Sequence, residues 1–169
     1  MNLFLWGALP YIAFTFLIVG TLVRFFYFER NWTTKSSEFL EKKQLRIANP
    51  LFHFGLLCVI GGHVVGVLIP KTWTAAIGIN DHMYHEGALY MGAVAGIIFI
   101  VGFLLLMKRR FTVPAMKVNT SGLDKWLYLF LTLAIFSGMA GTLLNASGFF
   151  DYRVSIGPWF RSLLAFMPD

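Results

Sequence analysis

The chain has 169 residues, of which 57 % are hydrophobic and 13 % are charged, and its formal net charge is +6. Ordinary soluble domains carry about 25 % charged residues, and a chain of this length has too little interior to hide such an apolar excess. The composition therefore excludes a water-soluble domain, and because the basic residues lie in loops between apolar runs they do not indicate nucleic-acid binding. The single cysteine, Cys58, excludes an internal disulfide, covalent c-type haem and cysteine-ligated iron–sulfur clusters within the chain.

Four apolar runs are each long enough for a transmembrane helix, which needs about 20 residues. None alternates with the period of two that is typical of barrel strands, so the sequence predicts an all-α integral membrane domain. The first run lacks a basic leader and a small-residue cleavage site, and we expect it to be a retained helix rather than a signal peptide. The predicted spans are 3–26, 50–69, 87–107 and 123–146, followed by a tail at 147–169.

Local signals mark several of the helix ends. Asn49 is a good N-cap and Pro50 suits a first helical position, so the second helix is predicted to begin there and to stop at Pro70. The turn-rich stretch NTSGLD, 119–124, offers caps for the fourth helix. In the tail, WFRSLLAF at 159–166 is too short to span a membrane and is predicted to lie along the outer interface as an amphipathic segment.

Basic residues are concentrated in two segments, one before the second predicted helix and one after the third. By the positive-inside rule these segments are cytoplasmic, which places the N-terminus and the tail outside. The eleven residues are Arg24, Arg30, Lys35, Lys42, Lys43, Arg46, Lys108, Arg109, Arg110, Lys117 and Lys125, and the other side has Lys71, Arg153 and Arg161.

Two histidines, His53 and His63, stand in the otherwise apolar stretch LFHFGLLCVIGGHVVGVLIP. Histidines within membrane helices are rare and are functional candidates by default, although a neighbouring helix can also satisfy such a ring. Ten residues separate their Cα atoms by about 15 Å along a helix and about 80° around it. Because imidazole–metal bonds are about 2 Å long, the two rings cannot ligate one ion. The spacing predicts two centres at different depths, with His53 nearer the cytoplasm.

Haem fits this arrangement better than a bare metal ion. Histidine is a common axial ligand of haem iron, and the flat porphyrin can approach a helix closely only where side chains are small. Arg109 and Arg110 are candidate partners for the haem propionates, or else charges that set the topology. Two haems stacked across a membrane would carry electrons from one face to the other. The small residues are Gly55, Gly61, Gly62 and Gly66, which could equally serve helix–helix packing.

His82 and His85 belong to the sequence NDHMYHEG, which is predicted to be the outer loop before the third helix. Two ligands three residues apart make an incomplete metal site, so solvated polar side chains are the simpler interpretation. A functional alternative is that a polar group here accepts protons from a quinol, because histidine titrates in the right range.

Several stretches together resemble the gamma subunit of respiratory membrane-bound nitrate reductase, a membrane cytochrome b, and particularly its Gram-positive bacterial versions. The resemblance covers the whole chain. It includes the two-histidine stretch above, LPYIAFTFLIVGTLVRFFYFERNWTTKSSEFLEKK, GFLLLMKRRF and DYRVSIGPWFR. It implies a bundle of five transmembrane helices with the N-terminus outside, in the bacterial cell membrane.

The resemblance also implies cofactors, substrate and partners. Such a subunit binds two haems b, with His53 as an axial ligand of the inner haem and His63 of the outer one. It oxidises menaquinol or ubiquinol near the outer haem, where Gly62 and His63 match the quinol site. Electrons then pass to an iron–sulfur beta subunit and to a molybdenum alpha subunit that reduces nitrate on the cytoplasmic side.

Two departures from the family pattern affect these expectations. The family takes its other two haem ligands from a fifth helix after a segment like RSLLAFMPD, so the chain is interpreted as truncated. We expect the 169 residues alone to hold no pair of bis-histidine haems and to oxidise no quinol. Some members also place a lysine near the outer haem, where this chain reads HMYHEGALY; Tyr84 or His85 could substitute for it.

Two alternative functions stay open at this point. One is a cytochrome b subunit of another quinol-linked reductase, of the heterodisulfide or sulfite type. The other is a membrane transporter or assembly protein that uses His53 and His63 without haem. The second is disfavoured because proton and metal pathways usually recruit carboxylates, and the predicted spans contain none except Asp124 at a boundary.

Overall fold

The computed structural model describes residues 3–28 and 38–167, and within them every regular element is a helix. These residues form two compact units, one of residues 3–28 and 161–167 and the other of residues 38–160. Arg30 and Lys35, two of the basic residues assigned to the cytoplasmic side, lie outside the described residues.

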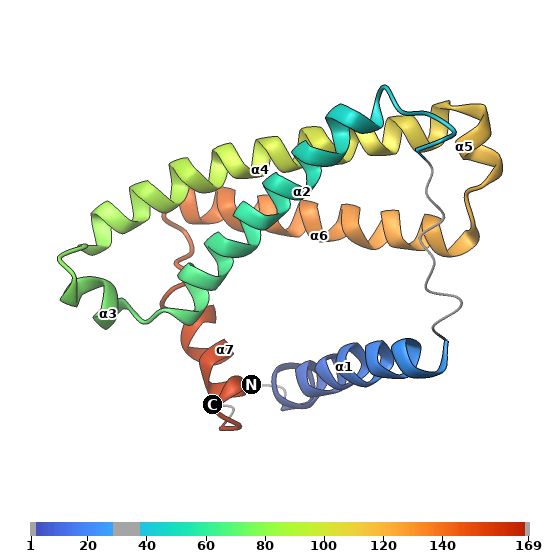
Figure 1. Ribbon diagram of the computed structural model, residues 1–169. Coiled ribbons are helices and arrows are strands. Elements are labelled where there is room, and N and C mark those ends of the chain that lie inside the picture. Colours follow the sequence, from blue (N-terminus) through green and yellow to red (C-terminus); the bar gives the residue numbers. More distant parts are fainter. Residues whose placement is uncertain (1–2, 29–37, 168–169) are drawn as a thin grey trace. The chain divides into compact units, whose positions relative to one another are not determined.

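The four membrane helices predicted from the sequence are confirmed, each being long and apolar enough to cross a bilayer (Figure 1). The protein is therefore an all-α membrane protein. Two of these helices combine an α-helix with a wider π-helical turn. The elements are η1 (Phe4–Ala8) with α1 (Leu9–Tyr27), α2 (Leu45–His63) with η3 (Val64–Leu68), α4 (Asp81–Thr112) and α6 (Gly122–Ala146), and the short helices are α3 (Lys71–Ala76), α5 (Pro114–Val118) and α7 (Ile156–Leu164).

The predicted start of the second helix is wrong, because α2 begins at Leu45 and contains Pro50 rather than starting with it. The Gln44 N–H donates to Glu41 Oε1 at 2.7 Å, and this bond holds the chain in a turn just before the helix. Pro50 is the sixth residue of α2, past the first turn, so the helix continues through it without the hydrogen bond that its N–H would have donated to the carbonyl four residues earlier. Asn49 is consequently a helical residue and not the cap.

The third helix also begins earlier than predicted. Asn80 caps α4, since its side-chain oxygen accepts from the Met83 N–H at 2.8 Å. His82 and His85 therefore lie in the first two turns of α4 and not in a loop, and Asp81 and Glu86 join the helix with them. The capping predicted for the fourth helix is confirmed, as the described caps at the start of α6 include a reciprocal pair between Ser121 and Asp124.

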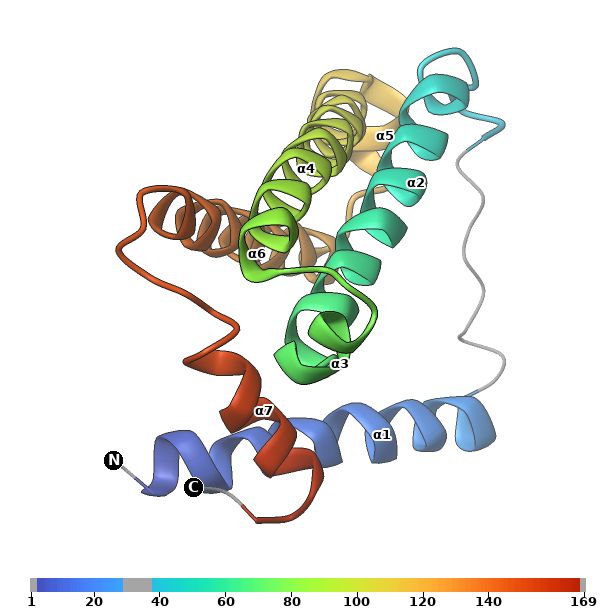
Figure 2. The same cartoon turned by 90° about the vertical axis from the view of Figure 1, so that its left-hand side faces the viewer.

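Helices α2 and α4 lie side by side in both views (Figures 1 and 2), and two glycines bring their backbones together. A Cβ on Gly55 would overlap the Phe99 backbone, and one on Gly102 would overlap that of Phe52. Next to these contacts the Phe52 ring packs on those of Phe99 and Phe103, with centroids 5.2 and 6.4 Å apart. Close backbone approach at small residues is the usual way in which membrane helices associate.

Helix α6 meets α4 near the Arg109 end. The ring of Tyr128 packs against those of Phe103 and Phe111 there, and Met116 of α5 is fully buried. Most other large apolar side chains of α6 are exposed, among them Phe130 and Phe136. Such a surface suits lipid, which solvates apolar side chains without burying them in protein.

In the other unit, Tyr11 of α1 links to the end of α7. Its hydroxyl donates to the Leu163 carbonyl at 2.8 Å, and its ring stacks on that of Phe166 at 5.8 Å between centroids. Leu163 is buried. The amphipathic segment predicted in the tail is thus helical in α7, and its position at the membrane interface stays a prediction.

Candidate functional site

The imidazoles of His53 and His63 are held alike on α2. Nδ1 of His53 lies 2.9 Å from the Asn49 carbonyl oxygen, and Nδ1 of His63 lies 2.7 Å from that of Val59. A carbonyl oxygen only accepts hydrogen bonds, so Nδ1 of each ring carries the proton and donates. The lone pair is then on Nε2, and both side chains are exposed. An imidazole whose Nδ1–H is bound to a carbonyl is in the usual state of a metal-ligating histidine.

The surface beside His63 fits a flat ligand. A Cβ on Gly61 or Gly62 would meet no heavy atom within 4 Å among the described residues, so no side chain covers this side of the helix. Around His53 the exposed ring is turned away from Gly55, the residue that packs on α4. One exposed imidazole at each of two depths fits one axial ligand for each of two haems.

The four glycines near the histidines divide into two pairs. Gly55 serves the close crossing with α4, and Gly66 receives the ring of Tyr152, because a Cβ there would lie 2.7 Å from a ring carbon. Gly61 and Gly62 remain open. Packing therefore occurs at Gly55 and Gly66, and ligand access at Gly61 and Gly62 stays a prediction.

Arg109 and Arg110 lie at the other end of α4, and both are bound to carboxylates. The Arg109 guanidinium, only 4 % exposed, donates to Glu41 Oε2 at 2.8 Å and to the Glu41 carbonyl at 2.7 Å. Arg110 pairs with Asp124 at 2.8 Å. The bond from the Gln44 backbone lowers the pKa of Glu41, and Arg109 lowers it further. The Nε of Arg110 is buried and has no hydrogen-bond partner among the described atoms.

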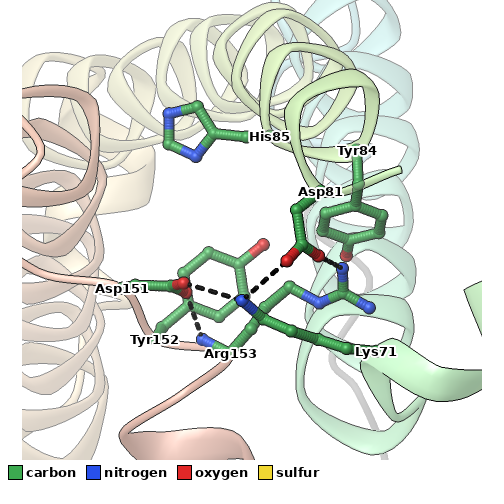
Figure 3. Close-up of a pocket in the computed structure, with 7 residues that line it drawn as sticks. All are labelled: Lys71, Asp81, Tyr84, His85, Asp151, Tyr152 and Arg153. Atoms are coloured by element: carbon green, nitrogen blue, oxygen red, sulfur yellow. Dashed lines mark hydrogen bonds and ion pairs between the residues drawn. The ribbon is translucent and has the colours of Figure 1, made fainter. Parts of the chain in front are cut away.

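A second group of polar side chains gathers at the His63 end of the α2–α4 pair, around a cavity of about 40 Å³ (Figure 3). We call it the outer polar cluster. Its residues come from α3, from the first turns of α4 and from the segment that follows α6. They are Lys71, Asp81, Tyr84, His85, Asp151, Tyr152 and Arg153.

Ion pairs connect the three segments of this cluster. The Lys71 ammonium lies between two carboxylates, 3.1 Å from Asp151 Oδ2 and 3.4 Å from Asp81 Oδ2 (Figure 3). The hydrogen bond to Asp151 raises the pKa of Lys71. Burial alone would raise the pKa of Asp151, but Lys71 and the Arg153 N–H hold it below its ordinary value. The cluster balances two basic against two acidic groups.

Arg153 is the buried member of the cluster, at 6 % exposure. Its Nη2 donates to the Thr74 hydroxyl at 3.1 Å, and its guanidinium lies 3.6 Å from the centre of the Tyr84 ring. Nη1 is 3.8 Å from Asp81 Oδ1, too far for a hydrogen bond. Nε and Nη1 are buried and lack hydrogen-bond partners within the described part of the chain. Such atoms leave part of the hydrogen-bonding capacity of Arg153 unmet beside the cavity.

Comparison with known proteins identifies the family. Residues 2–169 match the model of the nitrate reductase gamma subunit. The chain belongs to that family. It is accordingly a multi-pass bacterial membrane protein and a gamma-type subunit of an oxidoreductase, as the sequence predicted.

Individual relatives agree with this assignment. The nitrate reductase gamma chain of Bacillus subtilis is 46 % identical over 166 residues, which cover 98 % of this chain and 74 % of that one. The nitrate reductase-like protein NarX of Mycobacterium tuberculosis is 40 % identical over 96 % of this chain and 26 % of its own length. The respiratory nitrate reductase 1 gamma chain of Escherichia coli is 31 % identical over 85 % of this chain and 62 % of its own.

Within this gamma-type subunit, the structure brings together some of the residues chosen from the sequence. Tyr84 and His85 both line the outer polar cluster, whereas Arg109 and Arg110 lie at the opposite end of α4. Sequence reasoning missed Lys71, Asp151 and Arg153. A usable signal existed, because Lys71 and Arg153 are two of the few basic residues on a side that the charge distribution left almost free of them.

Proposed function

We propose that the chain is the di-haem b subunit through which a nitrate reductase takes electrons from a membrane quinol. The observation that carries the proposal is the pair of exposed imidazoles on α2, each with Nδ1–H bound to a carbonyl and Nε2 left with its lone pair. His53 would ligate the inner haem and His63 the outer one. When bound, the haems supply one-electron redox chemistry and a path across the bilayer.

The residues of the chain have separate tasks in this proposal. The Nδ1–H bonds orient the two rings and increase the basicity of Nε2. Gly61 and Gly62 keep the surface beside His63 low enough for a porphyrin and for the ring of menaquinol or ubiquinol, with Gly62 and His63 at the quinol site. Tyr84 and His85 are candidates to receive the quinol protons. Arg109 and Arg110 are candidates to face the inner propionates.

The orientation follows from the charges. The Arg109 end of α4, with its neighbouring basic loops, faces the cytoplasm by the positive-inside rule. The iron–sulfur beta subunit and the molybdenum alpha subunit would then dock on that end and accept the electrons. Lys71 and Arg153 at the opposite end are matched by Asp81 and Asp151, so the basic excess of the described loops lies on the proposed cytoplasmic side.

A pyridine haemochrome spectrum of the complex purified from haem-replete membranes tests the proposal. We expect b-type absorbance with two haems, both reduced by quinol, when the chain is produced with a further helix that carries the second histidine ligand of each haem. The 169 residues alone should hold no pair of bis-histidine haems and oxidise no quinol. The matched control is His82→Ala, because His82 is an exposed histidine on α4 for which no ligand role is proposed. Absence of b-type absorbance in the wild-type complex would refute the di-haem function.

A further inference from the structure

We infer that the outer polar cluster is the exit for the protons of quinol oxidation, with the hydroxyl of Tyr152 as their first carrier. The inference rests on the quinol site proposed above and adds to it a route and a positioning of the proton carriers. Oxidation of one quinol yields one quinone, two electrons and two protons. In the proposed function haem held at His63 would take up the electrons, and the two protons need a path of oxygen or nitrogen atoms to water, since hydrocarbon offers none.

The first step of the route is set by the contact between Tyr152 and Gly66. The Tyr152 hydroxyl lies 3.1 Å from the position of a Cβ on Gly66, so the phenol rests directly on η3. Gly66 is three residues beyond His63, which places it about 4.5 Å along the helix and on nearly the same face. A quinol bound at His63 therefore lies within about one helical turn of this hydroxyl.

The second step passes from Tyr152 to Tyr84 of α4. Burial raises the pKa of Tyr152, and its hydrogen bond with Tyr84 raises it further, so the phenol stays neutral. A neutral hydroxyl carries protons by accepting one on its oxygen while it donates its own hydrogen to the next acceptor. The atoms then balance, because each quinol proton that enters at Tyr152 releases one proton from it.

The last step reaches water through the carboxylates. The side chain of Asp81 is 67 % exposed and that of Asp151 is 49 % exposed, so both can release protons outward. Lys71 lies between them, and Arg153 lines the same cavity. Water in a cavity of about 40 Å³ bridges the phenols to the carboxylates.

Other groups face the same cavity, and one could carry the protons instead. His85 lies across the cavity from the ion pairs (Figure 3), and its imidazole is the titratable alternative to Tyr152. The remaining ionisable groups around the cavity are Lys71, Asp81, Tyr84, Asp151 and Arg153. A purely structural role, in which the cluster ties the segment after α6 to α3 and α4, would need the ring of Tyr152 but not its hydroxyl.

The test is Tyr152→Phe in the membrane-bound complex, because it keeps the ring against Gly66 and removes only the hydroxyl. We expect quinol-driven haem reduction in stopped flow to slow by about a hundredfold or more, the lower end of what a proton-transfer group contributes. The rate should also gain a steeper dependence on pH and a changed solvent isotope effect. Haem content, haem midpoint potentials and reduction by dithionite should stay at wild-type values. Tyr90→Phe, an exposed tyrosine of α4, is the matched control.

Three results would overturn or redirect the inference in distinguishable ways. A wild-type rate in Tyr152→Phe refutes the route through Tyr152, and slowing in His85→Gln alone assigns the step to His85 instead. Loss of haem or shifted potentials in Tyr152→Phe means that the hydroxyl is structural, which also refutes the route. A wild-type complex without b-type haem, or with haem that quinol does not reduce, refutes the proposed function itself.

Tyr84→Phe, which keeps the ring under Arg153, should slow quinol-driven haem reduction as well.

Discussion

At the Arg109 end of the α2–α4 pair each guanidinium is matched to one carboxylate, whereas at the other end Lys71 and Arg153 share two carboxylates around a cavity. Arg109 and Glu41 are both largely shielded, while Asp81 and Asp151 are open to water. The first arrangement locks α4 to the start of α2 and offers few paths for water. The second keeps ionisable groups in contact with solvent. In the proposed function only electrons leave through the first end, and protons leave through the second.

The largest effect expected from this comparison is loss of one haem at a time. In the full-length protein, His63→Ala should remove the outer haem and leave some inner haem bound, and His53→Ala should do the converse, since about 15 Å of helix separates the two rings. Optical and EPR spectra of purified complexes would measure the two haems separately. His82→Ala serves as the control. Equal and complete loss of both haems from either substitution would indicate misfolding or a single coupled site.

The next effect concerns the Arg109 end of the α2–α4 pair. Arg109→Ala removes a buried guanidinium that donates to both the side chain and the backbone of Glu41, so the turn before α2 loses its anchor. We expect the melting temperature of the complex to fall by about 5 °C or more. Lys108→Ala, at the exposed neighbouring position, should change it little. If Arg109→Ala melted like the Lys108 variant, the ion pair would not secure this end.

At the end of the α2–α4 pair near the outer polar cluster, substitutions of two glycines test stability and ligand binding separately. In Gly66→Ala the new Cβ would lie 2.7 Å from the Tyr152 ring, and such overpacking typically costs about 1–3 kcal/mol. Gly62→Ala meets no protein atom within 4 Å among the described residues, so it should preserve stability but weaken binding of the flat ligands proposed beside His63. Thermal melting and quinol titration separate the two outcomes. A stable Gly66→Ala protein would contradict the tight contact with Tyr152.

The smallest effect is the pH dependence of the Lys71–Asp151 pair. The pKa of Asp151 is lower in the folded protein than its reference value of 3.8, so the pair stabilises the fold above that pH. This contribution is lost as the pH falls through the folded pKa. The pKa of Lys71 is raised above 10.5, so its contribution is present below that pH and is lost as the pH rises through the folded pKa.

Amide hydrogen exchange of residues 151–154 would measure this dependence. Protection should weaken below about pH 4 in the wild type, in keeping with the ordinary titration of aspartate. In Asp151→Asn the acid-dependent part should be absent. A wild-type profile that stayed flat through the acid range would show that the pair adds nothing to local stability.

Much of the helical fold followed from local patterns. Hydropathy and length located the four membrane helices, and the sequence NTSGLD correctly indicated the cap of α6, because these signals lie within a few residues of the structure that they determine. Two helix starts were wrong. The turn held by Glu41 outweighed the proline signal at Pro50, and Asn80 provided a cap seven residues before the apolar run that suggested the start of α4.

The amino-acid sequence by itself determined the family, the membrane class and the spacing of His53 and His63, since composition and helical periodicity are properties of contiguous residues. The tertiary structure alone decided which glycines pack and which stay open, and it decided that Lys71 meets Asp151, a residue 80 positions away. No local pattern encodes such a pair, because its energy depends on the crossing of α2 and α4 and on the path of the chain after α6. The outer polar cluster is therefore visible only in three dimensions.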